Sequence, residues 1–134
     1  MNTRELSTIS RDIDMSAILD YARITGDFNP IHVDPAFAAT TAMGGVIAHG
    51  TLSMNLIWQL VSANFGIDAC RGASIDIRFA RPVRVGDRVT AGGVSRPDGG
   101  YDVWVRNQEG VAVIEGTMQP GEPQAYGEQG GRAP

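Results

Sequence analysis

The sequence predicts an α+β domain in which an antiparallel sheet of about five strands wraps around one central helix. Residues 51–65, TLSMNLIWQLVSANF, carry leucines at helical spacing and no charged residue, so this helix should be enclosed on most sides. From residue 73 to residue 118, short alternating segments follow one another, separated by the turn sequences PDGG and QEG. A single small sheet leaves unpaired edges, which favours a dimer.

The N-terminal elements are expected to be a strand and two short helices. Residues 4–13 alternate loosely and are predicted as a strand. A helix over 15–25 has Asp14 or Ser16 as its N-cap and ends at Gly26. Its apolar stripe predicts core positions for Ile18, Tyr21 and Ala22, and for Thr25 at its end.

A second short helix is predicted over residues 35–43. Pro35 suits its first turn, and the glycines at 44 and 45 close it. The stretch TGDFNPIHVD, residues 25–34, is therefore predicted to be an irregular loop held between two helices.

The second half of the chain is predicted to supply the rest of the sheet, with strands over 73–83, 88–95, 101–107 and 111–118. Period-2 spacing places Ile75, Ile77 and Phe79 on one face of the first of these. The domain is expected to cover residues 1–119. Residues 120–134 are rich in Gly, Pro and polar residues and are predicted to be a flexible tail.

Composition excludes several classes of protein. The net charge is −4 and the pI is about 5.0, which disfavours a general nucleic-acid surface. No apolar run is long enough to span a bilayer, and the N-terminus has no signal-peptide pattern, so we expect a cytoplasmic protein without membrane contact. The single cysteine, Cys70, allows neither an intramolecular disulfide nor a cysteine-rich metal site.

Arginines gather in RFARPVRVGDR, residues 78–88. Guanidinium groups suit bidentate contacts with phosphate, so Arg78, Arg81 and Arg84 are candidates for holding a phosphorylated carrier. Solvated strand residues would give the same pattern.

The candidate reactive residues are Asp27 and His32, five positions apart across an Asn-Pro turn. A carboxylate and an imidazole around one water form an acid–base pair, although a solvated loop pair has the same composition. Asn29 and Pro30 are expected to shape the turn, and Asp34 to cap the following helix.

A metal site is the alternative use of these side chains. His32, Asp34 and His49 would form a set of two histidines and one carboxylate, as in non-haem iron centres. The short spacing between the histidines and the lack of a visible jelly-roll pattern disfavour it, and no metal is expected.

The motifs TGDFNPIHVDPAFAA, preceded by Tyr21, and GGVIAHGTL resemble the MaoC-like dehydratases of the (R)-specific enoyl-CoA hydratase type, which are hotdog folds. A looser resemblance continues through RFARPVRVGD. The resemblance implies that Asp27 and His32 activate water and that the Gly50 N–H binds the thioester carbonyl of an acyl-CoA. It implies a structural role for His49, supporting roles for Asn29 and Pro30, no cofactor, and a homodimer.

Alternatives stay open at this point. Other hotdog enzymes carry an acidic residue on the central helix, which residues 51–65 lack. A substrate on acyl-carrier protein, or a non-catalytic acyl-thioester-binding or partner subunit, would keep the same fold. Met54 and Trp58 are either core filler or the lining of an acyl pocket, in which case Trp58 would restrict the pocket to short acyl groups.

Overall fold

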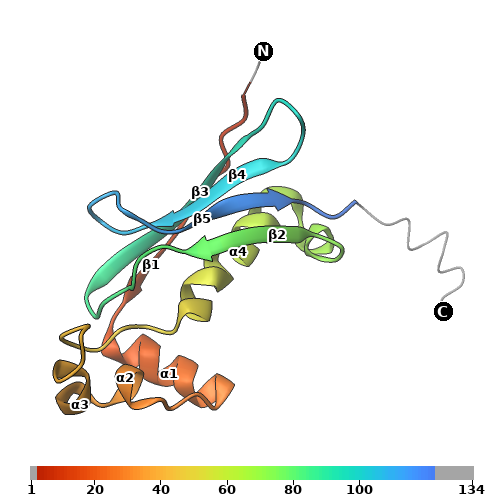
Figure 1. Cartoon of the computed structure of the whole chain (residues 1–134). Coiled ribbons are helices and arrows are strands. Elements are labelled where there is room, and N and C mark those ends of the chain that lie inside the picture. The colour runs from red at the N-terminus through yellow and green to blue at the C-terminus, as the bar shows by residue number, and fades with distance from the viewer. Residues whose placement is uncertain (1–2, 123–134) are drawn as a thin grey trace, which may run out of the picture.

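A computed structural model describes residues 3–122, in which a strongly curved five-stranded antiparallel sheet wraps around helix α4 (Figure 1). The strand order is β1-β3-β4-β5-β2, so β1 and β2 form the two edges. Helices α1, α2 and α3 gather beyond the N-terminal end of α4, away from the sheet (Figure 1). The predicted α+β architecture, a sheet around one helix, is confirmed.

The strand bounds lie within a few residues of the predicted ones, except that β1 starts later and β2 ends earlier. They are β1 Ile9–Ile13, β2 Ser74–Phe79, β3 Asp87–Ser95, β4 Tyr101–Arg106 and β5 Ala112–Gln119. In the central strands Ala91 lies opposite Val105, and Val105 opposite Ile114, and all three are buried. These inward-facing residues form the floor on which α4 packs.

Helix α4, Gly50–Phe65, supplies the centre of the core. Its apolar residues Leu56, Ile57, Leu60 and Val61 are fully buried against the sheet. Enclosure of one helical face removes these side chains from water. The burial of each one stabilises the folded state by roughly 1.5–3 kcal/mol. The absence of charged side chains from this helix is thereby explained, since a buried charge without a partner is costly.

The N-terminal helices follow their predicted caps. Helix α1, Met15–Thr25, begins where the Asp14 side chain accepts from the Ala17 N–H at 2.8 Å, and it ends at Gly26, which has a positive φ of 76°. Ile18 and Ala22 are buried as predicted, whereas Thr25 is exposed.

Two corrections concern the segment after α1. The predicted irregular loop contains a one-turn helix, α2, Pro30–Val33. Helix α3, Pro35–Ala39, is shorter than the predicted 35–43, because the hydroxyls of Thr40 and Thr41 donate to the carbonyls of Phe37 and Ala38. These bonds satisfy the last carbonyls and end the helix before the glycines.

The predicted apolar face of β2 is only partly buried. Ile75 and Ile77 pack against the core, but Phe79 at the end of the strand is 54% exposed. After α4, a 3₁₀ turn over Ile67–Cys70 connects to β2, and Cys70 packs half-buried against the core.

Of the predicted tail, residues 120–134, the structure describes only the first three residues. Gly121 is buried, and its N–H donates to the Ala69 carbonyl at 2.8 Å, so the chain stays packed to that point. The rest of the predicted tail, from residue 123, lies outside the described residues.

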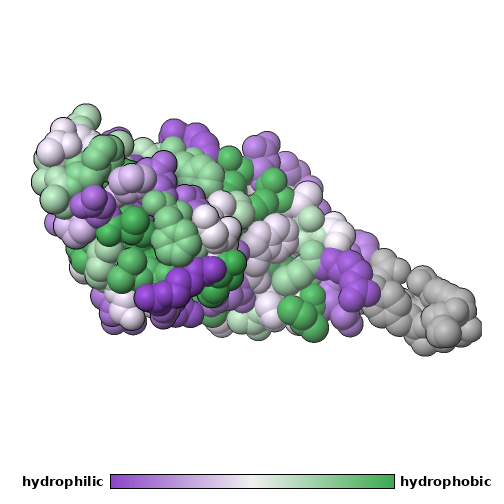
Figure 2. All heavy atoms as spheres, turned by 90° about the horizontal axis from the view of Figure 1, so that it is seen from below, coloured by the Kyte–Doolittle hydropathy of each residue, from purple (hydrophilic) through white to green (hydrophobic). Residues whose placement is uncertain are grey.

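The surface mixes apolar and charged groups. Seen from the side of α1–α3, hydrophobic residues are interspersed with hydrophilic ones (Figure 2). Exposed large apolar side chains here are Ile24 on α1, Phe28 between α1 and α2, and Phe37 on α3. No helix within residues 3–122 has the length and apolar character needed to cross a bilayer.

In the β3–β4 hairpin, a hydrogen bond from Arg96 lowers the pKa of Asp98.

Candidate active site

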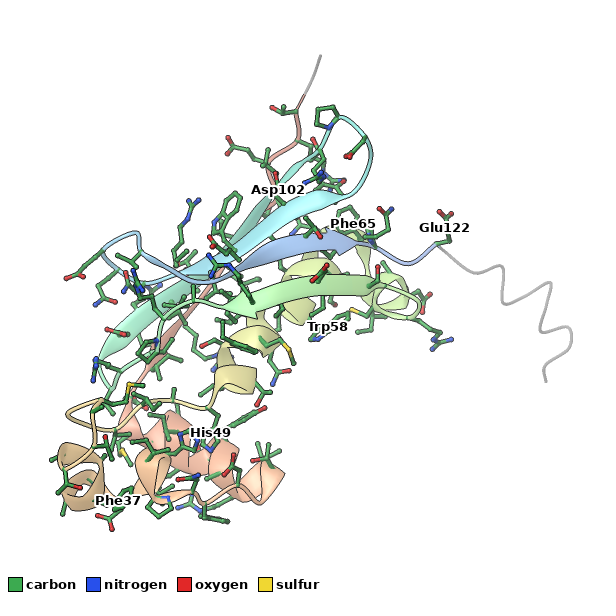
Figure 3. All side chains as sticks on the ribbon, in the orientation of Figure 1. Phe37, His49, Trp58, Phe65, Asp102 and Glu122 are labelled. Carbon is green, nitrogen blue, oxygen red and sulfur yellow. The ribbon has the colours of Figure 1, made fainter. Side chains whose placement is uncertain are left out.

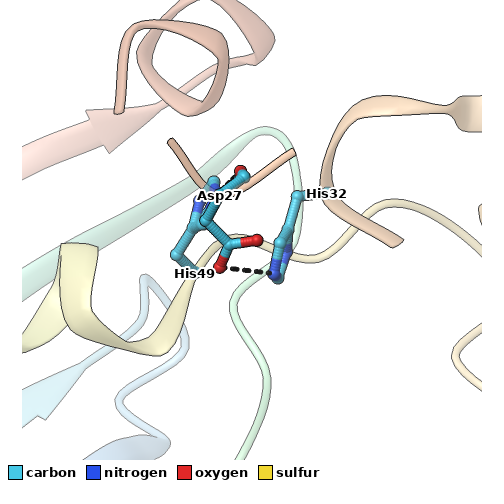
Figure 4. A group of neighbouring side chains, drawn as sticks. All are labelled: Asp27, His32 and His49. Carbon is cyan, nitrogen blue, oxygen red and sulfur yellow. Dashed lines mark hydrogen bonds and ion pairs between the residues drawn. The ribbon is translucent and has the colours of Figure 1, made fainter. Parts of the chain in front are cut away.

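Asp27 and His32 face each other at a distance that one water molecule beside them could bridge (Figure 4). His32 Nε2 lies 4.0 Å from Asp27 Oδ2. This is too long for a direct hydrogen bond, but a bridging water can reach both atoms. The Asp27 side chain is 51% exposed and that of His32 is 13% exposed. The carboxylate of Asp27 therefore meets solvent, while the imidazole of His32 is largely buried.

Backbone contacts orient both members of the pair. His32 Nδ1 lies 2.8 Å from the Ile47 carbonyl oxygen, which can only accept, so Nδ1 carries the proton. In the neutral ring Nε2 is then a free acceptor turned toward Asp27. The other carboxylate oxygen of Asp27, Oδ1, accepts from the Asn29 N–H at 3.1 Å.

His49 lies beneath the pair and connects it to α4. Its ring stacks on His32 with centroids 4.0 Å apart, and its Nε2–H donates to the Asp27 carbonyl oxygen at 3.0 Å. The side chain is 3% exposed. The resemblance implied a structural role for His49, and these contacts support that role.

Tyr21 was predicted to be a core residue, and this is wrong. It is only half-buried, and its hydroxyl donates to Thr51 Oγ1 at 2.7 Å, on the first turn of α4. Its ring meets His49 edge-on at 5.0 Å. A phenol at the border of the core can satisfy its hydroxyl only toward a polar neighbour, which the start of α4 supplies.

The other polar residues of the stretch have the predicted local roles. Asn29 caps α2 by accepting from the Ile31 N–H at 3.1 Å, and Pro30 occupies the first turn of that helix. Asp34 caps α3, accepting from the Phe37 N–H at 3.1 Å. The Asn29 cap fixes the path of the chain between Asp27 and His32, and the Asp34 cap fixes the chain that follows.

A cavity of about 260 Å³ lies beside the N-terminus of α4. Gly50, Ser53 and Phe79 line it, together with the following residues: Met43, Ile47, Ala48, His49, Ala80, Arg81, Pro82, Val83, Val113 and Ile114. Within the described residues nothing accepts the Gly50 N–H, which belongs to the first helical residue. The free amide and the positive end of the helix dipole therefore border an apolar cavity.

The structure does not bring the two predicted pocket residues, Met54 and Trp58, to this cavity. At roughly 100° per residue, Trp58 lies about 140° around the helix from Ser53. Its side chain points away from the sheet and is half-buried (Figure 3), while Met54 packs against the core.

The three predicted phosphate-binding arginines differ in their partners. Arg78 pairs with Glu115 across strands β2 and β5, and Arg84 donates to the Met43 carbonyl at 2.6 Å. The Arg81 side chain has no such partner among residues 3–122 and lies at the cavity wall. Of these three arginines, only Arg81 lines the cavity.

Asp27, His32 and His49 are the group that could hold a metal ion in the described part of the chain, with ligand atoms within 4.8 Å of one another. Two of the four imidazole nitrogens are already hydrogen-bonded to backbone carbonyls. The set considered from the sequence included Asp34, which caps α3. His32 Nε2 and the Asp27 carboxylate are open to an ion, but His49 is not, because its Nε2 is bonded to the Asp27 carbonyl and its Nδ1 is buried.

Sequence reasoning missed two residues of the cavity, Ser53 and Phe79. Ser53 shares the buried face of α4 with apolar residues, and a lone hydroxyl at such a helical position was the available signal. The alternation of β2 placed Phe79 on one face with Ile75 and Ile77, and only the position of the end of β2 beside Gly50 shows that it borders the cavity.

Comparison with known proteins places this arrangement in context. The family described as "MaoC like domain" matches residues 2–101. The (R)-specific enoyl-CoA hydratase of Aeromonas caviae is 37% identical over 83 residues, which is 62% of each protein. The 3-hydroxybutyryl-CoA dehydratase of Methylorubrum extorquens is 37% identical over 81 residues, covering 60% of this chain and 52% of the relative. The chain thus matches only about half to two thirds of these relatives' length.

Among solved structures, the (R)-hydratase from A. caviae involved in PHA biosynthesis superposes with a TM-score of 0.73 at 29% identity. The match covers 90% of this chain and 95% of that one. The sheet wrapped around α4 is therefore the hotdog fold of these proteins.

Proposed function

We propose a hydratase function for this chain, which belongs to the MaoC-like domain family. The reaction is the reversible addition of water to a trans-2-enoyl thioester, giving an (R)-3-hydroxyacyl thioester. The oxygen of water bonds to C3, a proton is delivered to C2, and the C2–C3 double bond becomes single. Relatives named (R)-specific enoyl-CoA hydratase and 3-hydroxybutyryl-CoA dehydratase support this direction and its reverse.

The observation that carries the proposal is the 4.0 Å gap between His32 Nε2 and Asp27 Oδ2. Both atoms are acceptors when Asp27 is ionised and His32 neutral, so a water between them donates to both. Its lone pair is then free to attack C3. One of the two groups takes the proton, and the pair returns a proton to C2, as expected of acid–base catalysis.

Gly50 is proposed to stabilise the charge that develops during attack. Electrons displaced from the double bond build negative charge on the thioester carbonyl oxygen. The unpartnered Gly50 N–H at the start of α4, supported by the helix dipole, is suited to receive it.

The proposed substrate is an acyl-CoA, with no further cofactor. Arg81 at the cavity wall is proposed to contact a CoA phosphate, because guanidinium groups bind phosphate oxygens in pairs. The proposed acyl group is short, because the cavity of about 260 Å³ is small for a ligand pocket. Substrates carried on acyl-carrier protein are the second possibility, and a comparison of kcat/KM for crotonyl-CoA and for crotonyl-acyl-carrier protein separates the two.

We also propose a homodimer. Strand β2 is an edge of the sheet, and its residues Ser74–Phe79 pair only with β5 within the described chain. Such an edge readily accepts another strand. Sedimentation of the intact protein should give twice the chain mass.

The test of the function is hydration of crotonyl-CoA, followed by loss of the conjugated thioester absorbance and by chiral analysis of the product. We expect Asp27→Asn and His32→Ala each to lower kcat roughly 10²- to 10⁴-fold while leaving the thermal unfolding temperature near that of the wild type. Asp20→Asn is the matched control, since Asp20 is an exposed carboxylate paired with Arg23 on α1. Full activity of either site variant would overturn the role given to that residue. An inert wild type that still binds acyl-CoA would overturn the hydratase function in favour of a binding subunit.

A further inference from the structure

Ser53 is a buried polar residue without a hydrogen bond. It is 2% exposed, and its Oγ has no partner within residues 3–122. A buried hydroxyl left unpaired costs about 1–3 kcal/mol. Helical serines commonly donate to the carbonyl four residues earlier, but the Ser53 hydroxyl makes no such bond. Its neighbours on the inner face of α4 are aliphatic, so packing alone would favour an apolar residue here.

The Ser53 hydroxyl shares the cavity with the Gly50 amide. Both residues line it, and they are three positions apart on one face of α4. Helical side chains lean toward the helix N-terminus, which directs the Ser53 side chain toward the first turn, where the Gly50 N–H lies. Two unpartnered donors therefore border the same space.

We propose that the Ser53 hydroxyl donates a second hydrogen bond to the thioester carbonyl oxygen, beside the Gly50 N–H. This rests on the proposed hydratase function, because that function places a thioester carbonyl at the start of α4. A carbonyl oxygen has two lone pairs and accepts two such bonds.

The second donor would act mainly in the transition state. As the oxygen of water bonds to C3, the electron pair of the double bond moves toward C2 and the carbonyl, and the oxygen becomes an enolate oxygen. When C2 takes up a proton, the C=O double bond of the thioester re-forms and the carbonyl oxygen is neutral again. A hydrogen bond to a charged oxygen is about twice as strong as one to a neutral oxygen, so Ser53 should affect kcat more than KM.

The first experiment measures crotonyl-CoA hydration by Ser53→Ala and Ser53→Cys. We expect Ser53→Ala to lower kcat roughly 10²-fold with little change in KM, and Ser53→Cys, a weaker donor, to lie between it and the wild type. Ser62→Ala is the control, because Ser62 lies on the same helix, is half-buried and does not line the cavity. Equal kcat for Ser53→Ala and the wild type would overturn the proposal.

The second experiment needs no turnover. Butyryl-CoA with a ¹³C-labelled carbonyl is saturated and is not hydrated, and its carbonyl stretch when bound reports the hydrogen bonds to that oxygen. We expect the stretch to lie at higher frequency in Ser53→Ala than in the wild type and in Ser62→Ala. An unchanged frequency would overturn the role of Ser53 even if hydration is confirmed. A shifted frequency in a protein without hydratase activity would support Ser53 and contradict the proposed function.

Discussion

The imidazoles of His32 and His49 lie stacked, with centroids 4.0 Å apart and planes inclined by 26°. His49 also donates from Nε2 to the Asp27 carbonyl oxygen at 3.0 Å. One buried ring thus contacts both members of the candidate pair, and it does so from the residue directly before α4. The relative position of Asp27 and His32 depends on this ring, which makes His49 a positioning residue.

His49→Phe should keep the stacked ring and lose the hydrogen bond to the Asp27 loop. We expect kcat for crotonyl-CoA to fall by roughly 10²-fold, since small displacements of reacting groups have effects of that size. His49→Gln, which can still present an N–H toward the Asp27 carbonyl, should recover part of the loss, with KM nearly constant throughout. If Gln and Phe variants are equally impaired, the hydrogen bond is not what positions Asp27.

Gly50→Pro tests the backbone donor directly. Proline is tolerated in the first turn of a helix, and the preceding residue, His49, has the extended ψ of 134° that proline favours. The substitution removes the N–H, so we expect kcat to fall roughly 10²- to 10³-fold.

Gly50→Ala is the matched control, because it keeps the N–H while adding a Cβ 3.0 Å from Phe79 Cε1. Phe79 is partly exposed and can shift, so this variant should lose less activity than Gly50→Pro. Similar unfolding temperatures for the two variants would show that α4 is intact. Equal activities would mean that the amide is not the donor.

Arg81→Ala should raise KM for crotonyl-CoA by roughly tenfold, equivalent to about 1.4 kcal/mol, without a large change in kcat. The same variant should show an unchanged KM for the N-acetylcysteamine thioester of crotonate, which lacks phosphates. Arg88→Ala serves as the comparison, since Arg88 pairs with Asp12 at 2.8 Å and does not line the cavity. A rise in KM for both thioesters would assign Arg81 to the acyl part of the site.

Acyl-chain preference should respond to Phe79 and not to Trp58. The Phe79 ring lines the cavity, whereas Trp58 lies on another face of α4. We expect Phe79→Ala to raise kcat/KM for an eight-carbon enoyl-CoA relative to crotonyl-CoA, and Trp58→Ala to leave that ratio unchanged. A changed ratio in Trp58→Ala would restore the pocket role that the sequence suggested for this residue.

The sequence by itself determined the architecture and the starts of the two helices that flank the reactive loop. A charge-free apolar helix can be stable only when enclosed, and alternating strands separated by glycine turns can enclose it. The caps at Asp14 and Asp34 could be predicted because each is a contact between a side chain and a backbone group a few residues away.

Only the tertiary structure decided which residues from distant segments meet. Tyr21 left the core because its hydroxyl reaches Thr51, thirty positions away. Likewise, Phe79 borders the cavity because the end of β2 packs beside Gly50, while Trp58 does not line it. Helical and strand periodicity states which residues share a face, but not what that face meets. The cavity, the unpartnered Ser53 hydroxyl and the stacked histidines follow from that long-range packing.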